Sequence, residues 1–362
     1  MTRATRAVID LPALRHNFSL ARQRAPRSRN LAIIKANGYG HGIVPVARAL
    51  NGEADAFGVA CLEEAIILRE AGIARPIVLL EGVPRAADLD LVRGYQLELV
   101  VHRVEQVAML ESLPAGGRPV PVWLKVDTGM HRLGVQPDQT AALFQRLREA
   151  RAVATPVRLM THLANADDRS DAITRRQLDD FAAATQGIDA PRSIANSAGI
   201  LGWPDSHADW NRPGIMLYGV SPFVEGDAAG EGLRPVMTLQ SELIAVNRQA
   251  KGAAVGYGGA YVCPEAMPIG VVAIGYGDGY PRHAPGGTPV RINGTTVPLA
   301  GRVSMDMICV DLRQAPDARP GDPVELWGGD LPVAEVAECA GTIGYELLCR
   351  VTSRVRFDYR DE

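Results

Sequence analysis

The 362 residues of the chain, 47% of them hydrophobic, predict one large domain with a smaller one beside it, because single hydrophobic cores stop growing near ~250–300 residues. A formal net charge of −3, with acids and bases mixed along the chain, excludes the basic surface of a nucleic-acid-binding protein. No apolar run reaches the ~20 residues of a membrane span and the first residues turn polar too soon for a signal peptide, so we expect a soluble cytoplasmic protein.

Short apolar segments alternate with longer amphipathic ones over the first two-thirds of the chain. Eight apolar segments are bounded by turn residues, as buried parallel strands are: 31–35, 56–60, 76–82, 98–102, 121–127, 157–164, 192–197 and 213–219. Between them, Leu143, Phe144, Leu147 and Ala150 share one helical stripe. This alternation predicts an α/β fold, a (β/α)8 TIM-type barrel over residues 11–230. Its chemistry is expected at the carboxyl ends of the strands, and a doubly wound open sheet is the alternative.

Beyond about residue 230 the pattern changes to strand-like runs joined by Gly, Pro and Asn turns, with one helical stretch near 333–350. The Asn293–Gly294 pair predicts a two-residue β-hairpin turn. Residues 6–10 are strand-like, precede the first helix and have no place in the barrel. We therefore expect residues 1–10 and 231–362 to form a second, mainly β C-terminal domain.

Lysine is rare in this chain. Only Lys35, Lys125 and Lys251 are present, so 35 of the 38 basic residues are arginine. Arginine does not lose its proton to become a nucleophilic amine, whereas lysine can. Lys35 and Lys125 lie in apolar, strand-like segments, which favours a chemical role for both, and Lys251 fits an ordinary surface position.

The five cysteines are odd in number and scattered, and none forms a CxxC pair. They are expected to be small buried hydrophobic residues in a reducing compartment rather than disulfides or metal ligands. The seven histidines show no metal-ligand spacing, so the sequence does not support a metal enzyme.

The segment AIIKANGYGHG at 32–42 is the most distinctive feature of the sequence. Lys35 ends an apolar strand and precedes a Gly-containing turn, so its amine is expected at the mouth of the barrel. Surrounding apolar side chains would lower the pKa of this amine and free its lone pair for a Schiff base. The alternative is a lysine that extends from a strand end into solvent.

The same segment resembles the cofactor-attachment motif of bacterial alanine racemases, which are fold-type III pyridoxal-phosphate enzymes. Seven further segments resemble that family in the same order along the chain: LKVDTGMHRLG (124–134), THLANAD (161–167), NRPGIMLYG (211–219), VGYGGAY (255–261), AIGYGDGYPR (273–282), AGRVSMDM (300–307) and TIGYELLCR (342–350). One such motif is weak, but eight in order are specific. The resemblance implies a racemase that interconverts L-alanine and D-alanine with pyridoxal 5'-phosphate.

The resemblance also implies the catalytic residues. Lys35 would bind the cofactor as an aldimine and later act as one of two bases. Racemisation needs one group to remove the α-proton from one face and another to supply it on the opposite face, and Tyr257 matches the second base. A tyrosine with a pKa near ~10 is a poor base at neutral pH, so its environment must stabilise the phenolate. His162 beside Tyr257, with Arg212 beyond it, matches the residues for that task.

Further basic residues match family positions around the cofactor ring and the substrate. Arg212, expected at the start of the last barrel strand, would face the pyridine nitrogen. Because arginine keeps its proton, that nitrogen would stay largely unprotonated, which disfavours side reactions such as transamination. Arg132 corresponds to an arginine near the phenolic oxygen of the cofactor and the substrate carboxylate. Lys125 matches a lysine that is carbamylated in many members and holds that arginine, although a plain Lys125–Asp127 neighbourhood would look the same in sequence.

The resemblance further implies where the cofactor phosphate and the substrate bind. Backbone N–H groups and hydroxyls at strand ends and helix starts suit an anion, and the matching cofactor-binding positions are Tyr39, Asn196, Ser197, Gly214, Ile215 and Tyr345. Met305 would bind the substrate carboxylate through its backbone N–H, with Tyr276 and Asp306 at the substrate entrance. A core position for Met305 is the structural alternative.

In the family, the barrel of one subunit and the β domain of the other share each active site. The resemblance therefore implies a head-to-tail homodimer in which Tyr257 and the Met305 segment serve the barrel of the partner. The other predicted partner of the protein is a small amino-acid substrate, and we expect the protein to bind neither a nucleic acid nor a membrane.

Two other functions share parts of this pattern. A non-catalytic pyridoxal-phosphate carrier resembles only the barrel, whereas this chain adds a full β domain with the segment 255–261. A fold-type III decarboxylase would place an acidic residue at the pyridine nitrogen and carry a Gly-rich phosphate loop, whereas this sequence has Arg212. We therefore predict alanine racemisation that supplies or degrades D-alanine for peptidoglycan metabolism, and serine or other small amino acids stay open as further substrates.

Overall fold

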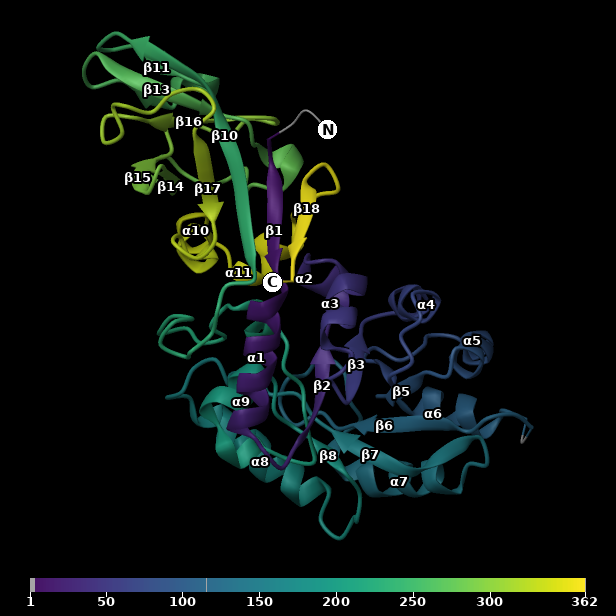
Figure 1. The fold of residues 1–362 in the computed structure, drawn as a ribbon. Coiled ribbons are helices and arrows are strands. Elements are labelled where there is room, and N and C mark those ends of the chain that lie inside the picture. Colours follow the sequence, from purple (N-terminus) through teal and green to yellow (C-terminus); the bar gives the residue numbers. More distant parts are fainter. Residues whose placement is uncertain (1–3, 115, 362) are drawn as a thin grey trace.

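The computed structural model describes residues 4–114 and 116–361. Figure 1 shows a barrel wrapped by helices in its lower half and an elongated β domain above it. The strand β1 and the helix α1 follow each other directly, so the chain crosses from the β domain into the barrel within its first residues.

Eight parallel strands form the barrel, and β2 pairs with both β3 and β9, which closes the ring. The closed ring rules out the open sheet and confirms the predicted TIM-type barrel. The strands are β2 (Arg29–Ile33), β3 (Ala56–Val59), β4 (Ile77–Leu79), β5 (Glu98–Val101), β6 (Val120–Lys125), β7 (Val153–Met160), β8 (Arg192–Ser193) and β9 (Trp210–Asn211).

Helices surround the strands because each carries one apolar stripe that needs a partner surface. The first of them begins where the side chain of Asp10 accepts a hydrogen bond from the backbone N–H of Ala13 at 2.7 Å. In α7, the predicted stripe residues Leu143, Phe144 and Leu147 are buried. The main helices are α1 (Leu11–Arg24), α3 (Ile43–Leu50), α4 (Leu62–Glu70), α5 (Leu89–Gly94), α6 (Val104–Glu111), α7 (Thr140–Glu149), α8 (Ala172–Ala184) and α9 (Ser197–Gly202).

Two predicted strand positions are wrong. The last barrel strand is β9, which ends at Asn211, whereas most of the predicted strand 213–219 forms the 3-10 helix η4 (Ile215–Tyr218). Pro213 lacks an N–H, so its carbonyl oxygen still accepts from the N–H of Ile33 at 2.9 Å but it donates no ladder bond, and the strand goes no further. Arg212 therefore follows the last strand instead of starting it. Lys35 likewise lies beyond β2, where it begins the short turn α2 (Lys35–Tyr39).

The β domain is built on a sheet that brings the first and the last strand of the chain side by side. The strand β1 (Arg6–Asp10) pairs antiparallel with β10 (Met237–Gln249) and parallel with β18 (Arg356–Arg360). The predicted hairpin joins β14 (Pro289–Ile292) to β15 (Thr295–Pro298), and Asn293 and Gly294 both have positive φ. The other elements are β11 (Ala254–Val255), β12 (Tyr261–Val262), β13 (Met267–Val272), β16 (Ile308–Asp311), β17 (Pro323–Trp327), α10 (Val333–Cys339) and α11 (Gly344–Cys349).

The cysteines are all free thiols, but their predicted burial is only partly right. Cys263 is buried, Cys61 and Cys309 are partly buried, and Cys339 and Cys349 are exposed. The two exposed cysteines lie at the carboxyl ends of α10 and α11, where the last turn faces solvent. Among residues 4–114 and 116–361, no helix combines the length and the apolarity needed to cross a membrane.

Candidate active site

A left-handed turn follows Lys35 at the carboxyl end of β2. Ala36, Asn37 and Gly38 have φ values of 53°, 54° and 64°, and Tyr39 follows at 49°. For an L-residue this conformation costs roughly 1–2 kcal/mol, so the local sequence would not adopt it unaided. Backbone strain of this kind concentrates at functional sites, where the surrounding structure enforces it.

Neighbouring elements hold this turn in place. Glu64 on α4 accepts hydrogen bonds from the backbone N–H groups of Asn37 at 3.3 Å and Ala60 at 2.9 Å, which ties the turn to the end of β3. The Asn37 side chain accepts from the N–H of Ile43 at 3.0 Å, where α3 begins. A side chain at Gly40 would clash with the backbone of α11 at Leu348, so the turn also packs tightly against the β domain.

The turn brings Lys35 into a cluster of basic groups at the carboxyl ends of the strands. Lys125 ends β6, and His162 and Arg212 follow β7 and β9. Burial holds the pKa of His162 well below its usual range, and the charges of Arg212, Lys125, Arg132 and Lys35 lower it further. His162 is therefore neutral, and the surrounding field is strongly positive and suited to an anionic ligand.

Arg212 is the most constrained member of this cluster and is only 5% exposed. Its Nη1 donates to the Ser193 hydroxyl at 2.6 Å, and its Nη2 donates to the carbonyl oxygens of Thr161 at 2.6 Å and Ile194 at 2.9 Å. The same Nη2 lies 3.4 Å from Nδ1 of His162. Burial lowers the pKa of Arg212 to about 10, so the group stays charged at neutral pH. Within the described part of the chain, no acceptor engages its Nε, which stays available to a ligand.

Lys125 lies at the end of β6 and is 8% exposed. Burial lowers its pKa to about 8, and the charges of Arg212 and Arg132 contribute in the same direction, whereas Asp127 raises it. A substantial fraction of this amine is therefore neutral near pH 8. Arg132 itself is exposed in a single chain.

A second group of residues forms a cradle of hydroxyls and backbone N–H groups beside Lys35, and we call it the phosphate cradle: Tyr39, Ser197, Gly214 and Ile215. The Ser197 hydroxyl accepts from the N–H of Gly214 at 2.9 Å, which fixes the start of η4 against the start of α9. A Cβ at Gly214 would lie 2.9 Å from the Tyr39 hydroxyl, so only glycine leaves this space open. The first N–H groups of a helix have no partner within it, which favours an anion here.

Asn196 and two aromatic rings flank the phosphate cradle. Asn196 caps α9 by accepting from the N–H of Gly199 at 2.9 Å. The ring of Tyr39 stacks on Tyr218 with centroids 4.6 Å apart, and Tyr345 from α11 lies 6.2 Å away. Burial raises the pKa of Tyr345 to about 12, so it remains a neutral hydroxyl that can donate to an anion.

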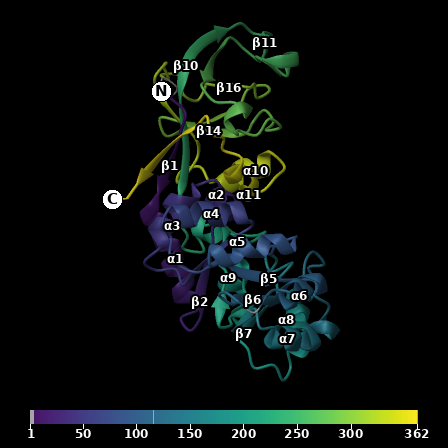
Figure 2. The same ribbon diagram turned by 90° about the vertical axis from the view of Figure 1, so that its right-hand side faces the viewer.

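Among the predicted site residues of the β domain, Tyr345 lies beside the phosphate cradle, whereas Tyr257 lies apart from the basic cluster in a single chain. Tyr257 is 67% exposed in the 3-10 turn η5 (Tyr257–Gly259), between β11 and β12. Figures 1 and 2 place β11 at the end of the β domain that is farthest from the barrel. The expected neighbourhood of His162 and Tyr257 is therefore not formed within one chain, where His162 contacts Arg212 instead.

The Met305 and Tyr276 segments lie next to each other. The backbone N–H of Tyr276 donates to the carbonyl oxygen of Ser304 at 3.0 Å, and that of Gly277 donates to Met305 at 2.9 Å. Met305 is 53% exposed, so the alternative of a core position is wrong. The Oδ1 atom of Asp306 accepts a hydrogen bond from Nη2 of Arg354 at 2.6 Å.

Two supporting residues were missed in the sequence. Ser193 orients Arg212, and Gln177 on α8 donates to the carbonyl oxygen of His162 at 3.1 Å and accepts from the N–H of Ala164 at 2.8 Å. Gln177 is almost completely buried on the same helical stripe as Thr174 and Phe181. A polar side chain on an apolar stripe was the available signal, because a buried amide needs partners.

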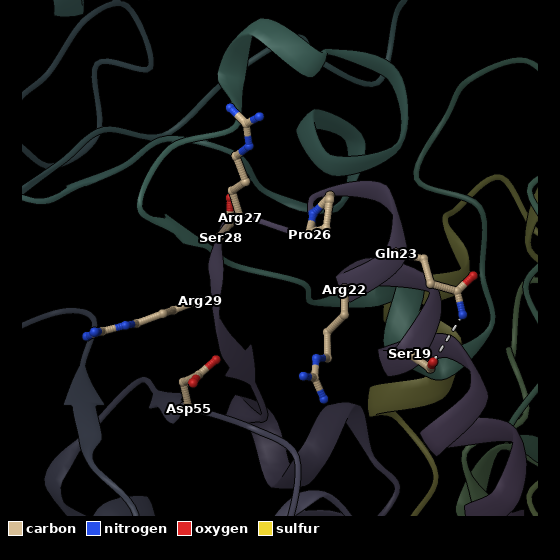
Figure 3. Close-up of a pocket in the computed structure, with 8 residues that line it drawn as sticks. All are labelled: Ser19, Arg22, Gln23, Pro26, Arg27, Ser28, Arg29 and Asp55. Atoms are coloured by element: carbon tan, nitrogen blue, oxygen red, sulfur yellow. Dashed lines mark hydrogen bonds between the residues drawn. The ribbon is translucent and has the colours of Figure 1, made fainter.

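A large concavity elsewhere on the surface lacks this chemistry (Figure 3). It has a volume of about 530 Å³ and lies where α1 ends and β2 begins, at the amino-terminal side of the barrel strands. Its lining consists of Ser19, Arg22, Gln23, Pro26, Arg27, Ser28, Arg29 and Asp55. It contains none of the lysines or histidines, and barrels carry their chemistry at the opposite end, so the candidate site is the basic cluster at Lys35.

Known proteins resemble the whole chain. The family model described as "Alanine racemase, N-terminal domain" matches residues 9–222, and "Alanine racemase, C-terminal domain" matches residues 236–359. An alanine racemase of Halorhodospira halophila is 53% identical over 356 residues, which cover 98% of either chain. The structure of a biosynthetic alanine racemase from Pseudomonas aeruginosa has 46% identity and a TM-score of 0.96, with 99% of this chain and 100% of that chain covered. An alanine racemase of Bartonella henselae with covalently bound pyridoxal phosphate has 29% identity and a TM-score of 0.90, with 99% of both chains covered.

Proposed function

The chain belongs to the alanine racemase family, and on this premise we propose that Lys35 of one subunit and Tyr257 of its partner are the two bases that move the α-proton of alanine. The protein is a pyridoxal-phosphate-dependent isomerase that interconverts L-alanine and D-alanine. One observation carries the assignment of the bases. A basic cluster around Lys35 is assembled within a single chain, whereas Tyr257 stands exposed at the far end of the β domain.

The residues at the barrel mouth fit the cofactor. The phosphate cradle, with Asn196 and Tyr345 at its flanks, would hold the phosphate, and the Lys35 amine would hold the cofactor covalently, as in the Bartonella henselae relative. Arg212 would face the ring nitrogen, and its buried positive charge would disfavour a proton on that nitrogen. When bound, the cofactor supplies an electron-withdrawing ring that acidifies the α-hydrogen of the substrate.

Proton transfer is assigned to two groups on opposite faces of the substrate. The Lys35 amine removes or returns the proton on one face, and the Tyr257 phenol of the partner subunit does so on the other. A neutral His162 next to the charged Arg212 supports the second role, because a positive field beside the phenol favours its ionised form. The pair therefore works in either direction, as racemisation requires.

Arg132 and the Met305 N–H are assigned to the substrate carboxylate, with Tyr276 and Asp306 at the entrance. Lys125 is assigned the role of a carbamate that holds Arg132. The neutral amine attacks the carbon of carbon dioxide: a C–N bond forms, one C=O π bond opens to give a carboxylate, and the nitrogen releases one proton to water, so the neutral amine becomes an anionic carbamate. The lowered pKa of Lys125 supports this step, because only the neutral amine reacts. An anion there would also offset the crowding of positive charge.

We assign the protein to a head-to-tail homodimer with shared sites. The barrel of residues 11–230 contributes Lys35, and the β domain of residues 1–10 and 231–362 contributes Tyr257 to the partner. The exposure of Tyr257, Tyr276 and Met305 in a single chain supports this arrangement, because a partner subunit would cover these large side chains. D-alanine supply for peptidoglycan is the favoured role, by analogy with the Pseudomonas aeruginosa relative described as biosynthetic, and a cytoplasmic location remains a prediction.

Mixed dimers test the proposal. Lys35→Ala and Tyr257→Phe should each abolish most racemisation, and Tyr257→Phe should retain the cofactor absorbance. When the two inactive variants are co-expressed, each heterodimer has one site with both bases intact. Random pairing should then restore about a quarter of the wild-type activity. No recovery in verified heterodimers would show that both bases come from one chain and would overturn the shared site.

A further inference from the structure

Arg354 lies between two carboxylates of the β domain. Its Nη2 donates to Oδ1 of Asp306 at 2.6 Å, and its Nε lies 3.4 Å from Oδ1 of Asp278. Asp278 is fully buried, whereas Asp306 is partly exposed beside Met305. One guanidinium therefore connects a carboxylate in the interior of the domain to one at the edge of the site.

The carboxylates belong to the two segments assigned above to the substrate. Asp278 ends the 3-10 turn η6 (Tyr276–Asp278), and its Oδ2 accepts from the N–H of Gly275 at 3.0 Å, which closes that turn. Asp306 directly follows Met305. Because the fork of Arg354 has a fixed planar geometry, its two pairs set the distance between the η6 turn and the Met305 segment.

The segment that carries Arg354 is itself fixed to η6. The N–H of Thr352 donates to the carbonyl oxygen of Asp278 at 3.1 Å, and its hydroxyl donates to that of Gly277 at 2.9 Å. A side chain at Gly277 would collide with the Arg354 guanidinium. The guanidinium thus occupies a position that the backbone of η6 leaves open for it.

We propose that Arg354 is a positioning residue for substrate binding, which holds the Met305 backbone N–H and the Tyr276 side chain in register for the alanine carboxylate. The inference rests on the proposed function, in which these groups face the barrel of the partner subunit. Arg354 acts through Asp306 and Asp278 and is not assigned a contact with substrate. Its loss would leave the buried Asp278 without this partner and let the Met305 segment shift relative to η6.

Steady-state kinetics separate positioning from a general effect on folding. Arg354→Met should raise the KM for alanine at least about tenfold while kcat falls less than about threefold, because a displaced carboxylate site weakens binding more than proton transfer. The inhibition constant of propionate, which is alanine without its amino group, should rise in parallel. The cofactor absorbance should stay unchanged, since Lys35 and the phosphate cradle, which would hold the cofactor, lie in the barrel. Arg354→Lys should fall between the wild type and Arg354→Met.

Arg356→Met is the matched control. Arg356 lies two positions further on, and its guanidinium is paired with Asp358 on β18, with Nη2–Oδ2 at 2.8 Å, away from the Met305 segment. This variant should match the wild type in KM. Equal effects in Arg354→Met and Arg356→Met, or a fall in kcat without a change in KM, would overturn the inference. If Arg354→Met does not fold, Asp306→Asn decides, because it keeps the buried pair with Asp278 and should still raise KM.

Two heterodimers of identical composition give the sharpest test. With Lys35→Ala on one chain and Arg354→Met on the other, the single functional site uses an intact Met305 segment and should show the wild-type KM. With both substitutions on one chain beside a wild-type chain, the functional site uses the altered segment and should show the raised KM. The same KM in both heterodimers would overturn the inference, whereas failure of the shared site itself is revealed separately by the Lys35→Ala and Tyr257→Phe mixture.

Discussion

The Nη2 atom of Arg212 lies 3.4 Å from Nδ1 of His162, and two of the three other hydrogen bonds of this guanidinium end on main-chain carbonyl oxygens. Arg212 thus joins the ends of β7 and β8 as well as facing the ligand site. Arg212→Lys should therefore destabilise the fold, because an ammonium cannot reach all these acceptors and each buried acceptor left without a donor costs ~1–3 kcal/mol. Urea unfolding of the cofactor-free protein measures the loss, and Arg350→Lys, at a solvent-exposed pair with Glu346, is the control.

Acid should destabilise the protein through buried histidines. Burial lowers the pKa of His41 to about 4, whereas an unfolded histidine titrates near ~6.5. Between these two pKa values the histidine is protonated in the unfolded chain and neutral in the folded chain, so the free energy of unfolding falls as the pH drops. The loss from His41 reaches about 3 kcal/mol near pH 4. Urea unfolding at pH 7 and pH 5 should show a smaller difference for His41→Gln, and the exposed His283→Gln should leave the difference as in the wild type.

Lys125 should take up carbon dioxide. With a pKa near 8, a large part of the amine is neutral at pH 8, and occupancy should fall toward pH 6 as protonation removes the nucleophile. In 13C-labelled bicarbonate, the protein should show a bound carbamate carbon by NMR. Lys125→Arg should lose that signal, and Lys251→Arg should keep it. A signal that survives in Lys125→Arg would contradict the assignment.

Gly214 should be required for the phosphate cradle. In Gly214→Ala the new methyl group would press on the Tyr39 hydroxyl, so the space for a phosphate shrinks. The dissociation constant of pyridoxal phosphate should rise at least about tenfold, which corresponds to ~1.4 kcal/mol. Equilibrium dialysis provides the measurement. Gly52→Ala is the matched control, because no atom lies within 4 Å of its added Cβ.

The barrel was predictable because its strands are buried on both faces and bounded by turns, a pattern that survives without any tertiary information. The last strand was misplaced because 213–219 is equally apolar, and the contacts that hold it as η4 come from distant residues: it packs against α1, and the Ser197 hydroxyl accepts from the N–H groups of Gly214 and Met216. The hairpin at Asn293 was predictable because two consecutive positive φ values demand this pair of residues.

Some residues of the site could also be predicted from the sequence, and others could not. Lys35 could be found because a lysine between an apolar strand and a glycine turn is unusual in a chain that otherwise uses arginine. Glu64 and Arg354 could not be found, because their partners come from distant segments that only the fold brings near. The placement of Tyr257 was expected from family resemblance alone, since no pattern in one chain relates it to Lys35.

The scarcity of amines has a practical consequence. Of the three lysine side chains, Lys251 is fully open to reagents, Lys35 is half-buried and Lys125 is buried. An acylating dye applied to the enzyme with its cofactor bound should therefore label Lys251, in the turn before β11, and little of the other two lysines. Departure of the cofactor would release the Lys35 amine as a second target, so the dye bound per chain beyond that of the cofactor-bound enzyme would report the vacant sites.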